Sequence, residues 1–579
     1  MSDGLKHNVH IGLESGRVIN GSLTATFPEY IPEARILYFP AGIYRVSDTV
    51  TYSLDDLKAK QWETFTCEMC RNIHFLGEDK ETTIIRLDDH AAGFDTVLKP
   101  VISFNTASKP YDEHETTNCA MSNTIKDMTI DCGKGNDKAI GVYYISSNLG
   151  RMENVDIKAE SGKCGIYFDV GSEGIFRNIR ISGFDYGFES GYTSPVILEN
   201  VDVSGNRIAG IRPLNATMIT KSFNAGSLPT LELPEASYGR YYLYDEAAVV
   251  TGSLKGNCVN RSKADSLLKA KSMPKKPYES YDEDYVIVDD FGAVGDGVTD
   301  STRAIQAAMD SGKPIVLFGK GQYYISQPIK IPKTVKIVDF MYGNLAVGIE
   351  IITGEYECVF DICEDSEDTL FVENLFTHEQ MYGYSRAFGH TARRDVVFAD
   401  IYLPFNAMYY NTVGGSTVYI DNCFMTSGSY AQSGWLKYGC KPVFSRVLPY
   451  EFHDQTVYAN NLNIERGEIE LLNDHSEIYI DGYKLEGPGC TLKSINGGKT
   501  QINLCNAGIW SNRVPENSLF IMENSEIEMC GVLPFAYGTR ERSLLNAFEI
   551  DGEKINLLDI GEEITDDMCL ISYYKSTKK

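Results

Sequence analysis

A short alternating segment recurs along this chain and constrains its fold more than any other feature. Each copy begins with a small polar residue and continues with alternating apolar positions. In the first half the copies begin at Asp127, Asn154, Asn178 and Asn200, so that successive copies are 27, 24 and 22 residues apart. A period of this length, with one strand and one turn per repeat, is typical of a solenoid in which each coil covers the next.

The alternation within each copy indicates which kind of solenoid forms. Apolar residues recur at every second position, which predicts strands, because helices require a period near 3.6. A leucine-rich repeat would need a regular Leu/Asn consensus, and this sequence has none. We therefore expect an all-β fold of two right-handed parallel β-helices, whose coils stack at the inter-strand spacing of about 4.8 Å.

The repeats fall into two blocks. The copies of the second half begin at Asn374, Asp400, Asn422, Asn461 and Gly482. Between the blocks the pattern lapses into segments that contain Pro, Ser and Lys, which are typical of a linker. We predict a first β-helix over 1–212, a connector over 213–284 with one short helix near 263–270, and a second β-helix over 285–579. We expect the two β-helices to lie side by side, with a cleft between them.

The second block opens with a Gly-rich turn that leads to Asp300, which we predict to be the N-cap of an amphipathic helix over 301–309. Strands are expected to follow over 314–318 and 321–326, and the first block carries the same strand unit over 36–46.

Charge and composition exclude several classes of partner. Asp and Glu number 80 against 53 Lys and Arg, and the formal net charge of −27 would repel a phosphate backbone. No apolar run approaches the roughly 18 residues that span a bilayer. We therefore expect no nucleic acid and no membrane as partners, and a monomer or small homo-oligomer.

The 14 Cys residues form no dense framework, which favours reduced, buried thiols in a cytoplasmic protein; an extracellular location would follow if a leader preceded this sequence. The start of the chain lacks the apolar core of a signal peptide. The close pair Cys67 and Cys70 has no second pair beside it, and no two His residues stand at ligand spacing. The sequence predicts no metal and no cofactor.

Two carboxylates occupy equivalent positions in neighbouring repeats. Glu465 is fourth after Asn461 and Glu486 is fourth after Gly482, so the two are one coil, 21 residues, apart. Stacked carboxylates resist joint ionisation, which raises the pKa of one of them and suits a general acid for a glycosidic oxygen. The alternative is a solvated ladder in which these Glu residues pair with Lys484 or Arg466.

Four segments carry a resemblance to known proteins. The segments "DDFGAVGDGVTDSTRAIQAA" and "GQYYISQPIKIP" resemble the opening of the pectate-lyase-like β-helix superfamily. The segments "YANNLNIERGEIELLNDHSEIYIDGYKLEGPGCTLKSINGGKTQINL" and "GIYFDVGSEGIFRNIRISGFDYGFESG" resemble glycoside hydrolase family 55, the two-β-helix β-1,3-glucanases.

This resemblance implies an inverting glycosidase that acts on β-1,3-linked glucan or related oligosaccharides in the cleft. The Glu of the family's Lys-Thr-Glu-Gly motif, the proton donor, corresponds to Glu486, and the Glu of Leu-Asn-Pro-Glu corresponds to Glu465. The remaining expected substrate- or water-binding residues are Tyr143, Tyr144, Asn148, Asp169, Glu189, Thr193, Ser194, Asn461, Asn463 and Lys484. Tyr167 and Tyr483 are further expected platforms for sugar rings.

The sequence departs from the family where the attacking water would be held. The family's His-Trp-Gln corresponds to 143–145 and its Gly-Asn-Gln-Gln to 191–194, and neither stretch retains Gln. Other groups, among them Asp169, Glu189, Thr193 and Ser194, would have to hold the water, or the substrate has changed. A polysaccharide lyase, a fructan or other glycan enzyme, and a non-catalytic carbohydrate-binding β-helix remain the alternatives.

Overall fold

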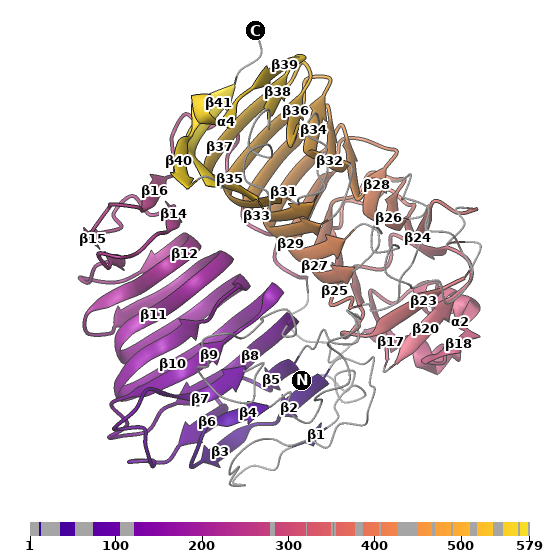
Figure 1. The fold of residues 1–579 in the computed structure, drawn as a ribbon. Coiled ribbons are helices and arrows are strands. Elements are labelled where there is room, and N and C mark those ends of the chain that lie inside the picture. Colours follow the sequence, from indigo (N-terminus) through magenta and orange to yellow (C-terminus); the bar gives the residue numbers. More distant parts are fainter. Residues whose placement is uncertain are drawn as a thin grey trace, which may run out of the picture. The chain divides into compact units, whose positions relative to one another are not determined.

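The computed structural model describes residues 11–12, 35–52, 73–104, 121–277, 284–319, 321–348, 351, 355–376, 386–403, 407–426, 448–465, 469–487, 490–509, 518–536, 548–565 and 568–576. The chain divides between Lys263 and Ala264 into two compact units, each of which is a solenoid of stacked strands (Figure 1).

The first solenoid, Val9–Lys263, is one sheet system of 16 strands paired in parallel. Its strands are β1 (Ile11–Gly12), β2 (Arg35–Phe39), β3 (Gly42–Val46), β4 (Val50–Tyr52), β5 (Ile73–Gly77), β6 (Thr83–Leu87), β7 (Lys99–Phe104), β8 (Met121–Asp131), β9 (Ala139–Tyr144), β10 (Ser147–Phe168), β11 (Ser172–Gly205), β12 (Ala209–Asn224), β13 (Leu231–Leu233), β14 (Arg240–Leu243), β15 (Val250–Gly252) and β16 (Cys258–Arg261). Strand β10 pairs with β8, β9 and β11, because its 22 residues take part in more than one face of the coil.

The second solenoid, within Ala264–Lys579, has three sheets. The 12-stranded sheet contains, in spatial order, β17 (Tyr285–Ile287), β19 (Ile315–Leu317), β22 (Ile337–Asp339), β25 (Leu370–Glu373), β27 (Val396–Leu403), β29 (Thr417–Thr426), β31 (Thr456–Glu465), β33 (Glu477–Gly487), β35 (Lys499–Ile509), β37 (Glu526–Ala536), β41 (Met568–Ser576) and β40 (Glu562–Thr565). All neighbours up to β37 are parallel, and β41 closes the sheet in antiparallel pairing.

The other two sheets complete the coils of the second solenoid. The 10-stranded sheet contains β21 (Ile329–Ile331), β24 (Cys358–Ile362), β26 (Arg386–His390), β28 (Ala407–Asn411), β30 (Tyr450–His453), β32 (Ile469–Asp474), β34 (Cys490–Ile495), β36 (Phe520–Met522), β38 (Phe548–Ile550) and β39 (Glu553–Ile555). The 3-stranded sheet contains β18 (Asp296–Asp300), β20 (Gln322–Ile325) and β23 (Asn344–Val347). The helices among the described residues are short: η4 (Val288–Phe291), α2 (Thr302–Met309) and α4 (Leu557–Ile560). The predicted all-β solenoid class is confirmed.

The small polar residue that begins each repeat has a structural role in the first solenoid. Asn154, Asn178 and Asn200 have φ values of 57°, 55° and 53°, in the left-handed region that Asn tolerates better than most residues. Their side chains form a ladder along the solenoid, in which Asn154 Nδ2 donates to Asp127 Oδ1 and Asn200 Nδ2 donates to Asn178 Oδ1, each at 2.6 Å. The recurring Asn thus bends the strand and links consecutive coils.

The second solenoid repeats this ladder. Asn422 Nδ2 donates to Asp400 Oδ1 at 2.7 Å, and Asn461 Nδ2 donates to Asn422 Oδ1 at 2.8 Å. At the next coil the corresponding residue is Gly482, with φ 74°, and it has no side chain to continue the ladder.

The first solenoid extends further than the sequence analysis predicted. Strands β13, β14, β15 and β16 continue the parallel stack to Arg261, across most of the segment for which a connector over 213–284 was expected. Here the Pro and Ser residues occupy turns, such as the one in which Ser237 Oγ donates to the Pro234 carbonyl, and the strands between them keep the repeat length.

The short helix predicted near 263–270 is not present, because the backbone amides there bind the second solenoid. Leu267 N–H donates to Glu528 Oε2 at 2.7 Å, and Leu268 N–H donates to Gln501 Oε1 at 2.8 Å. Glu528 and Gln501 are in register on β37 and β35, so this segment lies along the 12-stranded sheet.

The predicted helix over 301–309 is present as α2, one residue later than its predicted cap implies. Ser301 stands at the N-cap position, while Asp300 Oδ1 accepts a hydrogen bond from Thr302 N–H at 3.0 Å. Asp300 therefore binds the first turn from one position before the cap. The predicted strands over 36–46, 314–318 and 321–326 correspond to β2 and β3, β19 and β20.

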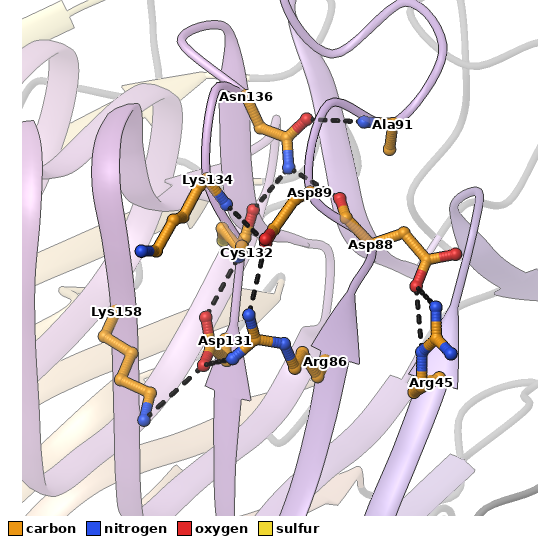
Figure 2. A network of polar contacts seen from close by, with 11 residues as sticks. Arg45, Arg86, Asp88, Asp89, Ala91, Asp131, Cys132, Lys134, Asn136 and Lys158 are labelled. Atoms are coloured by element: carbon orange, nitrogen blue, oxygen red, sulfur yellow. Dashed lines mark hydrogen bonds and ion pairs between the residues drawn. The ribbon is translucent and has the colours of Figure 1, made fainter.

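Polar side chains tie the turns at one rim of the first solenoid (Figure 2). Arg86 reaches Asp89 and Asp131, each at 3.1 Å, and Lys158 Nζ lies 3.5 Å from Asp131 Oδ2. These ion pairs are partly exposed, and such pairs contribute little to stability. The buried Asn136 matters more, because its amide binds three backbone groups of neighbouring turns: Ala91 N–H, Asp88 O and Cys132 O.

Candidate active site

The two acidic residues singled out from the sequence are direct neighbours in the second solenoid. Glu465 on β31 is in register with Glu486 on β33. The residues that alternate with them, Ile464 and Leu485, belong to the apolar core, so both carboxylates are on the outward face of the sheet. The one-coil separation predicted from the sequence is therefore confirmed.

A lysine lies between the two carboxylates. Lys484 Nζ is 3.4 Å from Glu465 Oε1 and 3.6 Å from Glu486 Oε1. The side chains are 13% exposed for Lys484, 7% for Glu465 and 22% for Glu486. This is the pairing with Lys484 that the sequence analysis gave as the alternative, but the three groups are largely buried rather than solvated.

Aromatic and amide side chains form the column of the sheet to which Lys484 belongs. The rings of Phe376 and Tyr402 stack at 4.3 Å between centroids, and those of Tyr402 and Phe424 stack at 4.8 Å. Asn463 follows Phe424 in register, and Lys484 follows Asn463. The three rings and Asn463 are all buried, so none of these rings offers an exposed face to a sugar.

The column that contains the two Glu residues ends differently. On the coil after Glu486 the residue in register is Gly508, which has no side chain. Glu486 therefore has one side on which no side chain of the next strand stands beside it, and it is the more exposed of the two carboxylates.

Three other predicted residues of this region have structural roles. Asn461 is fully buried and belongs to the Asn ladder. Tyr483 points into the core and is fully buried, which corrects its prediction as a sugar platform. Asn463 is buried in the Lys484 column, so it is placed to support that column rather than to meet a ligand directly.

The residues predicted in the first solenoid also include an outward-facing column. Tyr143 on β9, Tyr167 on β10, Glu189 on β11 and Arg212 on β12 are in register, one per coil. The rings of Tyr143 and Tyr167 stack at 5.4 Å with an interplanar angle of 5°. Arg212 Nη1 lies 3.0 Å from Glu189 Oε1, and Tyr143 Oη donates a hydrogen bond to Asp169 Oδ2.

Burial perturbs two acidic groups of this column. It raises the pKa of Glu189 above its usual value, although Lys163 and Arg212 oppose the shift. Burial also raises the pKa of Tyr167 to about 12, and the nearby Asp169 and Glu189 carboxylates add to that effect. Both shifts have the same sense, because each site disfavours additional negative charge.

Three other predicted residues of the first solenoid are structural. Tyr144 is fully buried, its ring packs on Phe168, and its hydroxyl donates to the Asn123 carbonyl, which corrects its prediction as a sugar-binding residue. Thr193 Oγ1 accepts a hydrogen bond from Thr217 N–H at 3.0 Å and so links two coils. Asn148 is buried near the start of β10, where it adopts φ 67°.

Ser194 is buried directly after Thr193. With Ser194, all twelve residues predicted from the sequence lie within the described part of the chain. In the second solenoid Glu465, Glu486 and Lys484 form one cluster, whereas the seven residues of the first are spread over a column, a core position and other positions in or between β10 and β11.

Part of the chain matches a known protein family. Residues 24–224 and 285–339 match the family described as "Rhamnogalacturonase A/epimerase, pectate lyase-like". The parallel coils of both units agree with that description. Over these residues the chain is similar to pectate lyase-like β-helix proteins.

More specific relatives of this β-helix protein are distant. A 74-residue segment is 46% identical to a "Probable glucan endo-1,3-beta-glucosidase" of Arthroderma benhamiae; it covers 12% of this chain and only 8% of that relative. The structure of sacteLam55A from Streptomyces sp. SirexAA-E aligns with a TM-score of 0.42 at 10% identity, over 97% of this chain and 99% of that chain. A variant of sacteLam55A in complex with glucose aligns with a TM-score of 0.47 at 10% identity, over 97% and 98%.

Two residues of the β-helix protein were missed in the sequence analysis. Arg212 follows Glu189 by 23 residues, one coil, and the count that linked Glu465 to Glu486 would have found it. Gly508 follows Glu486 by 22 residues in the same way. Neither residue belongs to a sequence motif, so they are identified only by the register of the parallel strands.

No group of three or more His, Cys, Asp or Glu side chains among the described residues is arranged to hold a metal ion. Cys132, Cys164, Cys358 and Cys423 are buried free thiols, and burial raises the pKa of each. The pair Cys67 and Cys70 lies outside the described residues. Within the described part of the chain, no helix has the length and apolar character needed to cross a bilayer.

Proposed function

We propose that this β-helix protein is an inverting glycoside hydrolase of β-1,3-linked glucan or a related oligosaccharide, with Glu486 as its general acid. The observation that supports this most strongly is the in-register Glu465 and Glu486 pair with Lys484 between them. The pair lies in the segment that resembles glycoside hydrolase family 55. The distant relative described as a glucan endo-1,3-beta-glucosidase supports the substrate class.

The roles of the two carboxylates follow from the geometry of inversion. A general acid donates its proton to the glycosidic oxygen as the bond to the sugar breaks, and a water attacks the opposite face of the sugar. The group that activates this water stands about 6.5–9.5 Å from the acid, whereas in-register residues on adjacent strands are only about 5 Å apart. Glu465 is therefore a partner of the acid rather than the base.

Glu486 is the better acid of the two because it is more accessible. Its side chain is 22% exposed against 7% for Glu465, and its neighbour on the next coil is Gly508. A glycosidic oxygen can approach the more exposed carboxyl, while Glu465 remains enclosed beside Lys484.

An activity screen of the full chain tests this function. The protein is incubated with β-1,3-, β-1,4- and β-1,6-glucans, α-glucans, fructans and rhamnogalacturonan, and the release of reducing sugar is measured. We expect cleavage of β-1,3-glucan and, by proton NMR during the first turnovers, an α-anomeric product. Ultraviolet absorbance of an unsaturated uronate would identify a lyase instead, and release of no product from any β-1,3-glucan would contradict the proposal.

A further inference from the structure

Lys484 lies in a largely buried column of the 12-stranded sheet. Its neighbours in the same outward column are Asn463 on β31 and Asn506 on β35, both buried. Lys484 itself is 13% exposed. The two Glu carboxylates stand two residues further along the strands, and the ammonium contacts both.

The contact of Lys484 with Glu465 and Glu486 reduces the repulsion between the two carboxylates. Two carboxylates on adjacent strands repel each other, and at low exposure this repulsion is weakly screened. One ammonium shared between them offsets part of this repulsion. The shared contact involves one oxygen of each carboxylate, Glu465 Oε1 and Glu486 Oε1.

The two carboxylates differ in what lies beyond them. Glu465 is 7% exposed, whereas Glu486 is 22% exposed and is in register with Gly508, which has no side chain. We propose that Lys484 is a positioning residue, which orients both carboxylates, offsets their repulsion and leaves Glu486 as the carboxyl that meets the substrate. This assignment rests on the proposed glycosidase function, and it replaces the predicted role of Lys484 in direct substrate or water binding.

The test compares Lys484→Met with Lys484→Arg in the full chain. Methionine keeps the length and removes the charge, so the acid holds its proton to higher pH. We expect the alkaline limb of the pH–rate profile on a β-1,3-glucan oligosaccharide to move up by about one pH unit or more, and kcat to fall more than KM changes. Lys484→Arg keeps the charge and should leave the limb in place.

A matched control comes from an ion pair that includes the next coil. Lys499 on β35 pairs with Glu477 on β33 at 2.7 Å, and both are more exposed than the candidate cluster. Lys499→Met removes an equivalent surface charge and should leave the limb unchanged. If Lys484→Met does not fold by circular dichroism, Lys484→Gln replaces it.

A second measurement separates this proposal from the proposed function. Infrared pH-difference spectra report protonated carboxyls without any substrate, and Glu465→Gln and Glu486→Gln assign the bands. We expect these bands to persist to higher pH in Lys484→Met than in the parent protein. Shifted bands in a protein that cleaves no glucan would support the positioning role of Lys484 and contradict the proposed hydrolase activity. Cleavage in which neither the limb nor the bands shift would overturn the role of Lys484.

Discussion

The two solenoids both stack charged side chains on an outward face, but they neutralise them differently. In the first, Glu189 has Arg212 as its partner, and the next two residues of the column are the stacked rings of Tyr143 and Tyr167. In the second, two carboxylates share the single ammonium of Lys484.

This difference indicates where chemistry is concentrated. A one-to-one ion pair satisfies its charges, and its removal affects mainly stability. In the second column two carboxylates share one cation, and Glu486 is the more exposed of the two, so a substrate can reach it. The comparison therefore predicts that the second column governs turnover and that the first governs stability.

The largest expected effect is on turnover. Glu486→Gln removes the proton donor and should lower kcat on the order of 10²-fold or more, with an unchanged thermal unfolding temperature because the substitution is isosteric. Glu189→Gln, the same change in the other column, should cost far less turnover. Steady-state kinetics of both variants on one β-1,3-glucan measures this difference. Equal losses of kcat in both variants would contradict the prediction.

The next effect concerns stability and its dependence on pH. Arg212→Met leaves Glu189 buried without its ion-pair partner and should lower the free energy of unfolding by about 1–3 kcal/mol at neutral pH. Because the pKa of Glu189 is raised in the folded protein, folding favours the protonated form, and stability falls as pH rises above the unfolded value of 4.5.

Loss of Arg212 raises that folded pKa further. The loss of stability caused by Arg212→Met should therefore be largest at pH values above the folded pKa of Glu189, and it should be absent below pH 4.5. Urea denaturation on either side of this range measures it. A loss of the same size at both pH values would show that Arg212 acts through packing rather than through its charge.

A smaller effect is expected beside Glu486. Gly508→Val adds a side chain at the position in register with the acid and should raise KM about tenfold, while the unfolding temperature changes little because Val suits a strand. Gly508→Ala should fall between Val and the parent. A KM that is unaffected by either change would mean that substrate does not approach from this side.

The smallest effect tests the ladder that passes through the candidate site. Asn461 Oδ1 is buried and has no hydrogen-bond partner among the described residues, and Gly482 occupies the next rung with φ 74°. Gly482→Asn would supply a donor there and should stabilise the protein by about 1 kcal/mol.

Gly531→Asn is the matched control for this change. It has a similar φ of 62°, but the preceding rung is Leu504, which offers no side-chain acceptor. Equal shifts in both variants by calorimetry would assign the gain to the chain entropy of glycine instead.

The coil period and the neighbouring positions of the two Glu residues follow from the amino-acid sequence alone. These depend on one local quantity, the spacing between repeats, which sets the register of parallel strands. Counting from Asn461 and Gly482 was enough to place Glu465 beside Glu486, although their segment follows the 39-residue interval from Asn422 to Asn461.

What each side chain of a coil contacts depends on the tertiary structure. Tyr144 and Tyr483 face the core, whereas Tyr143 and Tyr167 face outward, and composition alone does not distinguish them. Likewise, Lys484 contacts both Glu residues instead of the solvent, and Glu189 pairs with Arg212. The physical reason is that burial and ion pairing depend on side chains brought together from different coils, whereas repeat spacing is a property of the chain itself.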